Sequence, residues 1–159
     1  MPAPGEAAER RSSELERHLR QANGDPRAWI LKARLAMQSD RHAKAAAAYA
    51  QALAGRSKAV NDAGVWVEYA EALGMRQGRT LLGEPQRLVC KALEIDGRHP
   101  RALDLAGSAA WESGDYGGAV AHWQRLLEQL PLGSERHAEL TQAIARAEQR
   151  ARLALPPRR

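Results

Sequence analysis

The 159-residue chain contains no Phe and few of the residues that suit a β-sheet: five Val, three Ile and two Thr. β-branched and aromatic residues favour strands, so their scarcity excludes an all-β or α/β fold. Ala, by contrast, makes up about a fifth of the chain and has the highest intrinsic helix propensity. The length corresponds to about one domain. We therefore predict a single all-α domain.

The chain also lacks the features of disulfide-bonded and membrane-spanning proteins. The one cysteine excludes an intramolecular disulfide, a cysteine-rich zinc site and a CxxCH haem attachment site. No apolar run reaches the roughly 18 residues of a membrane-spanning helix, and the first residues have no apolar core like that of a signal peptide. These absences indicate a cytoplasmic protein if the chain is complete as given. The same absences are equally expected of a soluble domain from a membrane-anchored or exported protein.

The formal net charge of +5 does not indicate a nucleic-acid partner. Four arginines in the last ten residues supply +4 of it, which leaves about +1 for the other 149 residues. They are Arg150, Arg152, Arg158 and Arg159. Nucleic-acid-binding proteins concentrate Lys and Arg on a folded face, and Lys is scarce here. We expect no nucleic-acid partner.

Three related segments follow one another along the chain. A large residue recurs every 37 positions, and a small residue follows each large one by four positions. The large residues are Trp29, Trp66 and Leu103, and the small ones are Ala33, Ala70 and Gly107. A small residue lets two helix axes approach closely, and a large residue of the neighbouring helix fills the remaining gap. This pattern resembles the tetratricopeptide repeat, a pair of antiparallel helices about 34 residues long.

The resemblance implies an all-α tetratricopeptide-repeat solenoid of about eight antiparallel helices in one domain over residues 1–159. We expect an N-terminal helix over about 6–25, repeats over 26–57, 58–97 and 98–131, and a capping helix over 134–153. The individual helices are expected at 6–22, 26–38, 42–54, 62–76, 84–95, 99–112, 116–129 and 134–153. Extra residues in the middle repeat, at 56–63 and 77–85, leave its register open by one turn.

A more specific pattern covers residues 67–135. It contains a Tyr-Ala-Glu-Ala helix, a Gly-rich linker ending in Gly-Glu-Pro, a His-Pro-Arg-Ala-Leu helix start, Gly-Asp-Tyr, and Leu-Pro-Leu-Gly-Ser. This pattern resembles the periplasmic repeat domain of the cytochrome c maturation proteins CcmI (also called CycH) and NrfG. Asp96 followed by Gly97 departs from the Asp-Pro that is usual in that family.

The narrower resemblance implies a chaperone function. Such a domain holds the C-terminal segment of apocytochrome c in the periplasm and presents it to the haem-ligation machinery, without being the enzyme. Contact with a membrane would come only through an anchor absent from this chain. A generic repeat scaffold for another envelope or secretion complex is the first alternative. An enzyme, or a regulatory domain of one, is a second.

No catalytic or metal-binding pattern is visible in the sequence. The histidines are scattered, with no HExxH motif and no carboxylate at a metal-ligand spacing. We expect each of them on a solvated helix face or in a loop: His18, His42, His99, His122 and His137. Cys90 is expected to be a half-buried packing residue. We therefore expect no enzymatic activity, no metal and no cofactor.

Repeats of this kind bind peptides on the concave face built by the first helix of each pair. The residues projected onto this groove are Arg27, Ile30, Arg34, Met37 and Gln38, then Val67 and Glu71, then Arg101, Asp104, Ser108, Trp111 and Glu112. We expect the apolar members to hold ligand side chains, and Arg34 and Arg101 to meet a terminal carboxylate. The alternative for the charged members is a solvated surface, and for Trp111 a ring that covers a neighbouring helix. Trp29, Trp66 and Trp123 are expected in the core.

Overall fold

The computed structural model describes residues 4–21, 24–55 and 57–155. This part of the chain forms eight α-helices and one short 3-10 helix, and it contains no strand. The α-helices are α1 (Pro4–Gln21), α2 (Pro26–Gln38), α3 (His42–Leu53), α4 (Ala63–Arg76), α5 (Glu84–Ile95), α6 (Pro100–Glu112), α7 (Tyr116–Leu127) and α8 (Glu135–Ala154), and the 3-10 helix is η1 (Lys58–Asn61). The predicted all-α fold is confirmed. Arg158 and Arg159, which carry part of the charge surplus, lie outside the described residues, as do Ala22 and Arg56.

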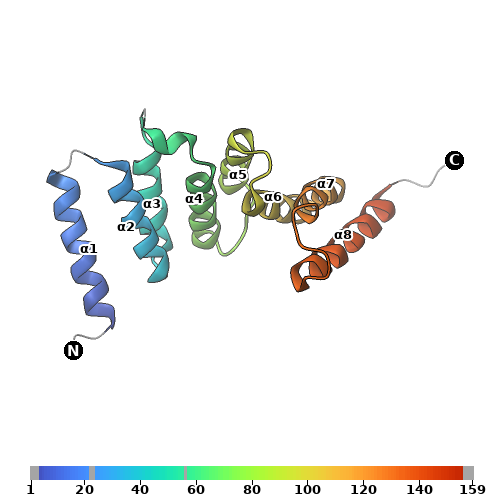
Figure 1. The fold of residues 1–159 in the computed structure, drawn as a ribbon, viewed down its shortest axis with the longest axis horizontal. Helices are drawn as coiled ribbons and strands as arrows, with labels where there is room; N and C mark the ends of the chain where they lie inside the picture. Colours follow the sequence, from blue (N-terminus) through green and yellow to red (C-terminus); the bar gives the residue numbers. More distant parts are fainter. Residues whose placement is uncertain (1–3, 22–23, 56, 156–159) are drawn as a thin grey trace.

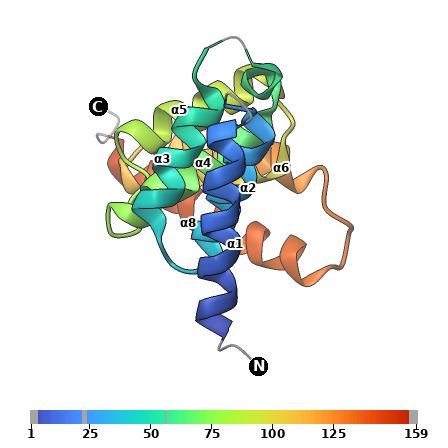
Figure 2. The same ribbon diagram turned by 90° about the vertical axis from the view of Figure 1, so that its left-hand side faces the viewer.

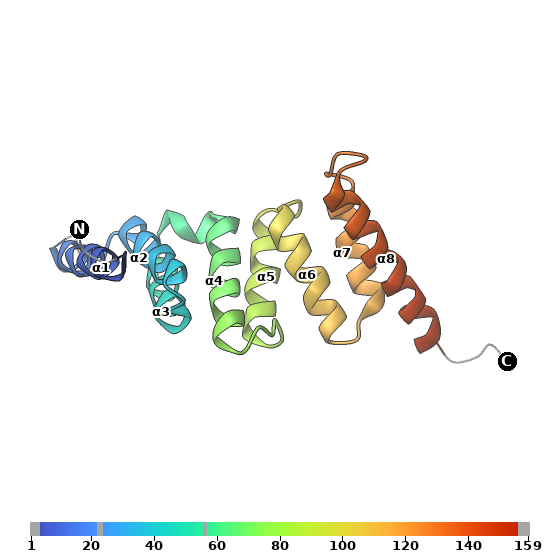
Figure 3. The same ribbon diagram turned by 90° about the horizontal axis from the view of Figure 1, so that it is seen from below.

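The helices are stacked in chain order along one axis (Figure 1). The pairs α2–α3, α4–α5 and α6–α7 each pack internally, and each pair also packs on the next. Helices α1 and α8 lie at opposite ends of the stack (Figure 3), and the end-on view places α1 in front of the other helices (Figure 2). This is the architecture of a solenoid, in which each unit contacts mainly its neighbours.

Local capping signals explain where the helices begin. Asp25 Oδ1 accepts a hydrogen bond from the Arg27 backbone N–H at 2.9 Å, and Pro26 opens α2. Asp115 caps α7 in the same way through the Gly118 N–H, also at 2.9 Å. Such caps satisfy backbone donors that the first helical turn leaves without partners. The predicted bounds of α2 and α5 agree with the structure, although α5 has no side-chain cap and begins with Pro85 in its first turn. The 3-10 helix η1 has no counterpart among the predicted helices.

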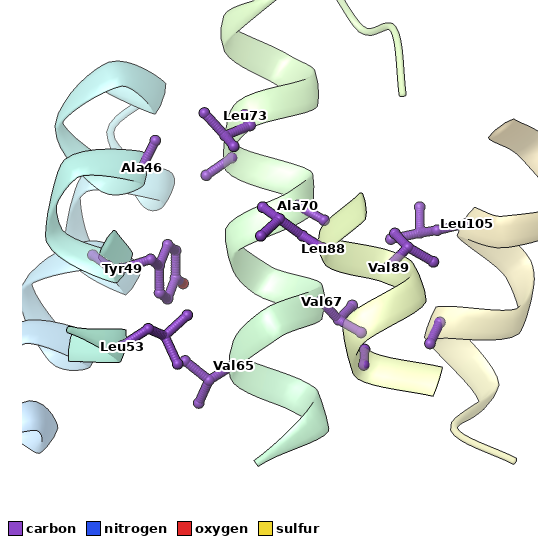
Figure 4. Close-up of a cluster of buried hydrophobic side chains, with 14 of the residues drawn as sticks. Ala46, Tyr49, Leu53, Val65, Val67, Ala70, Leu73, Leu88, Val89 and Leu105 are labelled. Atoms are coloured by element: carbon purple, nitrogen blue, oxygen red, sulfur yellow. The ribbon is translucent and has the colours of Figure 1, made fainter. Parts of the chain in front are cut away.

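The core is built from alanines at helix contacts and larger residues in the gaps between them. Tyr49 and Leu53 of α3 face Val65 and Leu73 of α4 in the cluster shown in Figure 4. A second cluster joins α6, α7 and α8 and contains Leu103, Trp123, Leu126, Leu140 and Ile144. Of the three tryptophans expected in the core, Trp123 is buried, while Trp29 and Trp66 are half-buried.

The exposure of several polar side chains differs from the prediction. Cys90 is exposed, because α5 turns its opposite side, with Leu88 and Val89, into the core. The helical residues His42, His122 and His137 are half-buried rather than solvated, whereas His18 is exposed and His99 lies in the loop before α6, as expected. His99 caps α6 by accepting a hydrogen bond from the Ala102 N–H at 3.2 Å. Burial lowers the pKa of His122, and the nearby Arg125 lowers it further.

Candidate functional site

Helices α2, α4, α6 and α8 share one surface, which we call the first-helix face and which carries a row of ion pairs. Arg34 of α2 donates to Glu68 of α4 from Nε at 3.0 Å and from Nη2 at 2.9 Å. The buried hydroxyl of Tyr49 on α3 donates to the same carboxylate at 2.7 Å. The hydrogen bond from Arg34 to Glu68 raises the pKa of Arg34. Burial is the main cause that raises the pKa of Tyr49, and the hydrogen bond from Tyr49 to Glu68 raises it further. Glu68 therefore joins three helices.

The row of ion pairs continues toward α8. Arg101 of α6 pairs with Glu71 of α4 and with Asp104 on its own helix, the latter at 3.1 Å. Asp104 also pairs with Arg136 of α8 at 2.9 Å, and Arg136 reaches Glu139 at 3.3 Å. The partners on different helices are 30 to 34 residues apart, close to one repeat length. Helix α8 thus takes the position that the first helix of a further repeat would occupy.

Val67 is the predicted groove residue that the structure moves away from this face. Its side chain is 3% exposed and points toward α5 (Figure 4), so it cannot contact a ligand at the surface. The neighbouring residue, Glu68, lies on the first-helix face instead. The expectation for Val67 was wrong because this side of α4 packs into the core, where Val67 belongs to the buried cluster that includes Val89 of α5 and Leu105 of α6.

The structure also revises the expected role of Arg34 and Arg101. Both guanidinium groups already contact carboxylates of this chain, those of Glu68 and Glu71. A terminal carboxylate of a ligand would have to displace these partners. The two arginines are therefore occupied, and they link successive helices.

The apolar members of the predicted groove are partly accessible. Ile30 and Met37 are half-buried on α2. Trp111 is also half-buried, with its ring edge-on to Tyr116 at 5.1 Å between centroids and 6.3 Å from the ring of Trp123. Trp111 therefore covers α7, the second helix of its own pair, and keeps part of its surface open to solvent.

The remaining predicted residues have ordinary surface or structural contacts. Arg27 and Gln38 are exposed. Ser108 Oγ donates to the backbone oxygen of Asp104 at 3.0 Å. The Glu112 carboxylate accepts hydrogen bonds from Thr80 Oγ1 at 2.7 Å and from the Leu81 backbone N–H at 3.2 Å. Glu112 therefore fastens the loop between α4 and α5 to the end of α6.

A recess of about 370 Å³ opens between α6 and α8 on the first-helix face, and we call it the α6–α8 recess. Its lining combines an apolar group (Trp123, Leu140, Ala143) with a polar group (Asp104, Ser108, Arg136, Glu139, Gln142, Arg146). The indole Nε1 of Trp123 is buried and has no acceptor within the described residues. Sequence reasoning missed this recess because it treated α8 only as a cap. The polar residues at helical spacing on α8 were the available signal.

A larger cavity of about 680 Å³ lies between α1 and the α2–α3 pair. Two ion pairs bridge α1 to its neighbours there, Glu9 with Arg41 at 3.1 Å and Glu16 with Lys32 at 3.0 Å. Lys32 also lies 5.1 Å from the centre of the Trp29 ring. The α2 residues that line this cavity lie on the opposite side of the helix from Arg34, so the cavity is separate from the first-helix face.

No group of three or more His, Cys, Asp or Glu side chains among the described residues is placed to hold a metal ion. No helix formed by these residues is both long enough and apolar enough to span a membrane.

A family model described as the cytochrome c-type biogenesis protein H TPR domain matches residues 13–137. The chain belongs to this family. It is also 31% identical over 144 residues to the cytochrome c-type biogenesis protein CycH of Pseudomonas aeruginosa strain PAO1. That match covers 89% of this chain and 34% of CycH, so the chain spans about a third of its relative. Family membership supports a role in cytochrome c-type biogenesis.

Solved tetratricopeptide-repeat domains are among the structures that this chain resembles. The TPR2B domain of yeast Sti1, in complex with pHsp70, has a TM-score of 0.64 and 20% identity over 78% of this chain and 96% of its own. The Sgt2 TPR domain from Aspergillus fumigatus has a TM-score of 0.65 and 22% identity, and the match covers 84% of this chain and 86% of the Sgt2 domain. MamA has a TM-score of 0.67 and 10% identity, and the match covers 89% of this chain and 87% of MamA. These structural similarities show that the fold is a repeat solenoid. Together with the family match, they indicate a protein-interaction module.

Proposed function

We propose that this chain is the periplasmic repeat domain of a membrane-anchored cytochrome c maturation protein. It holds the C-terminal segment of apocytochrome c and presents that segment to the haem-ligation machinery. It has no catalytic activity of its own and needs no cofactor. The observation that carries the proposal is the match of the cytochrome c-type biogenesis family over residues 13–137.

The first-helix face supports peptide binding by apolar anchoring. Its charged groups largely neutralise one another, as in the pairs of Arg34 with Glu68 and of Arg101 with Glu71. Ile30, Met37 and Trp111 remain partly accessible beside these pairs. Burial of apolar ligand side chains against such residues drives association, while the polar groups around them orient the peptide. Repeat solenoids offer this kind of long surface to extended or helical segments.

The test measures the affinity of the chain for synthetic peptides by calorimetry. One set contains the C-terminal segments of c-type cytochromes from the same organism. A matched set contains internal segments of the same proteins with equal length and net charge. We expect the C-terminal peptides to bind at least about tenfold more tightly, which corresponds to roughly 1.4 kcal/mol. Equal affinity for both sets would contradict the proposal and favour a generic scaffold.

A further inference from the structure

We infer that the α6–α8 recess receives the last residue of the bound segment, with its carboxylate at Arg146 and an apolar side chain against Trp123, Leu140 and Ala143. The inference rests on the proposed function and deepens it. It assigns the terminal carboxylate to α8 rather than to the paired arginines of α2 and α6.

The charges of the recess favour Arg146 as the group that binds a carboxylate. Arg136 already contacts both Asp104 and Glu139, so its charge is neutralised. Arg146 lines the same recess and has no acidic partner within the part of the chain that the structure describes. An arginine without a partner can offer its planar fork of N–H donors to both oxygens of one carboxylate.

The spacing along α8 separates the acidic and basic ends of the recess. Glu139 and Arg146 are seven residues apart, which corresponds to about 10 Å along a helix that rises 1.5 Å per residue. The acidic side chains therefore gather at the Arg136 end, and repulsion from them falls with distance from that end. A negatively charged ligand group is placed most favourably at Arg146.

The recess is large enough for the last residue of a peptide and has an apolar floor. Its volume of about 370 Å³ is at the lower end of the roughly 300–1,000 Å³ of small-ligand sites. Trp123 and Leu140 are 8% and 2% exposed, so they offer only the edges of their side chains. The recess therefore fits a terminal residue with an aliphatic side chain rather than a whole helix of the partner.

The test uses acetyl-Ala-Ala-Leu, as the free acid and as the amide, at millimolar concentration. Binding is followed by NMR through the indole N–H signals of the four tryptophans, with Trp123 assigned from Trp123→Phe. We expect the free acid to shift the Trp123 signal and the amide to bind more weakly. Arg146→Gln should weaken binding of the acid about fivefold to tenfold and leave that of the amide unchanged.

Arg150→Gln is the matched control, because Arg150 is an exposed arginine one turn further along α8 that does not line the recess. It should bind the acid as the parent does. The inference is wrong if the Trp123 signal does not move, or if Arg146→Gln binds the acid as tightly as the parent. The same comparison of acid and amide is then made with the cytochrome C-terminal segments.

The two proposals fail in different ways. If those longer segments do not bind while the short acid still binds through Arg146, the proposed function falls and the recess assignment stands. If the segments bind with equal affinity as acid and amide, the proposed function stands and the recess assignment falls.

Discussion

Gly107 of α6 lies directly against the indole ring of Trp123 of α7, whose Nε1, Cδ1 and Cε2 atoms fill the space that a Cβ would need. The sequence predicted this contact, because Gly107 occupies the small position of the third repeat. Close approach of α6 and α7 therefore depends on the absence of a side chain at residue 107.

Gly107→Ala is expected to destabilise the fold by about 1–3 kcal/mol, because the added methyl group overpacks a buried contact. Thermal unfolding followed by circular dichroism measures the loss. Gly117→Ala is the matched control, since a Cβ there meets only Asp115 Oδ1 at 4.0 Å. The control should be as stable as the parent or more stable by up to about 1 kcal/mol, owing to the higher helix propensity of Ala. A melting temperature of Gly107→Ala equal to that of the parent would show that the α6–α7 contact is looser than described.

Tyr49→Phe is expected to lower the free energy of unfolding at neutral pH by about 1–2 kcal/mol, since the Glu68 carboxylate loses a buried donor. The pKa of Tyr49 is raised above its ordinary value of about 10 in the folded state. The neutral phenol therefore stabilises the fold in full below pH 10, and this contribution is lost as the pH rises further. The loss is at most about 1.4 kcal/mol per pH unit. Tyr49→Phe should show a shallower alkaline loss of stability than the parent in chemical denaturation from pH 8 to 11. An unchanged slope would contradict this prediction.

A chain that ends at Gly133 is expected to aggregate or to lose cooperative unfolding. It lacks α8, whose buried Leu140 and Ile144 pack with Trp123 and Leu126 of α7. Terminal repeats need a polar outer surface to remain soluble. Size-exclusion chromatography and calorimetric unfolding test this expectation. The assignment of residues 134–153 as the cap of one domain stays a prediction, and a monomeric, cooperatively unfolding truncation would speak against it.

Trp111→Ala is expected to weaken binding of a C-terminal cytochrome segment by about 1–3 kcal/mol if the ring anchors the peptide centrally. The loss should depend little on salt, because it removes apolar area rather than charge. Anisotropy with a labelled peptide measures the affinity at low and high ionic strength. Trp111→Phe keeps an aromatic ring against Tyr116 and Trp123 and serves as the control. If Trp111→Ala binds as tightly as the parent, the first-helix face does not hold the peptide through this ring.

Features encoded by neighbouring residues could be predicted from the sequence. Asp25 with Pro26 marks the start of α2, and Gly107 marks the α6–α7 contact, because capping and helix packing depend on one or two adjacent turns. The pairing of Arg34 with Glu68 could not be predicted, since it joins residues 34 positions apart. Predicting such a contact requires the helix register of the middle repeat, and the extra residues at 56–63 and 77–85 left that register open by one turn. Val67 was placed in the groove because the repeat pattern alone did not show that this side of α4 packs into the core.

The row of ion pairs joins consecutive first helices at the surface, and buried apolar contacts join the same pairs beneath it, as where Tyr49 and Leu53 of α3 face Val65 and Leu73 of α4. Salt screens exposed charges over about 8 Å at physiological ionic strength and acts far less on buried apolar contacts. We therefore expect rising ionic strength to loosen the surface ion pairs while the apolar core keeps successive repeats stacked. The shape of the surface offered to a partner would then stay constant, and only the freedom of its charged side chains would follow the salt content of the surroundings.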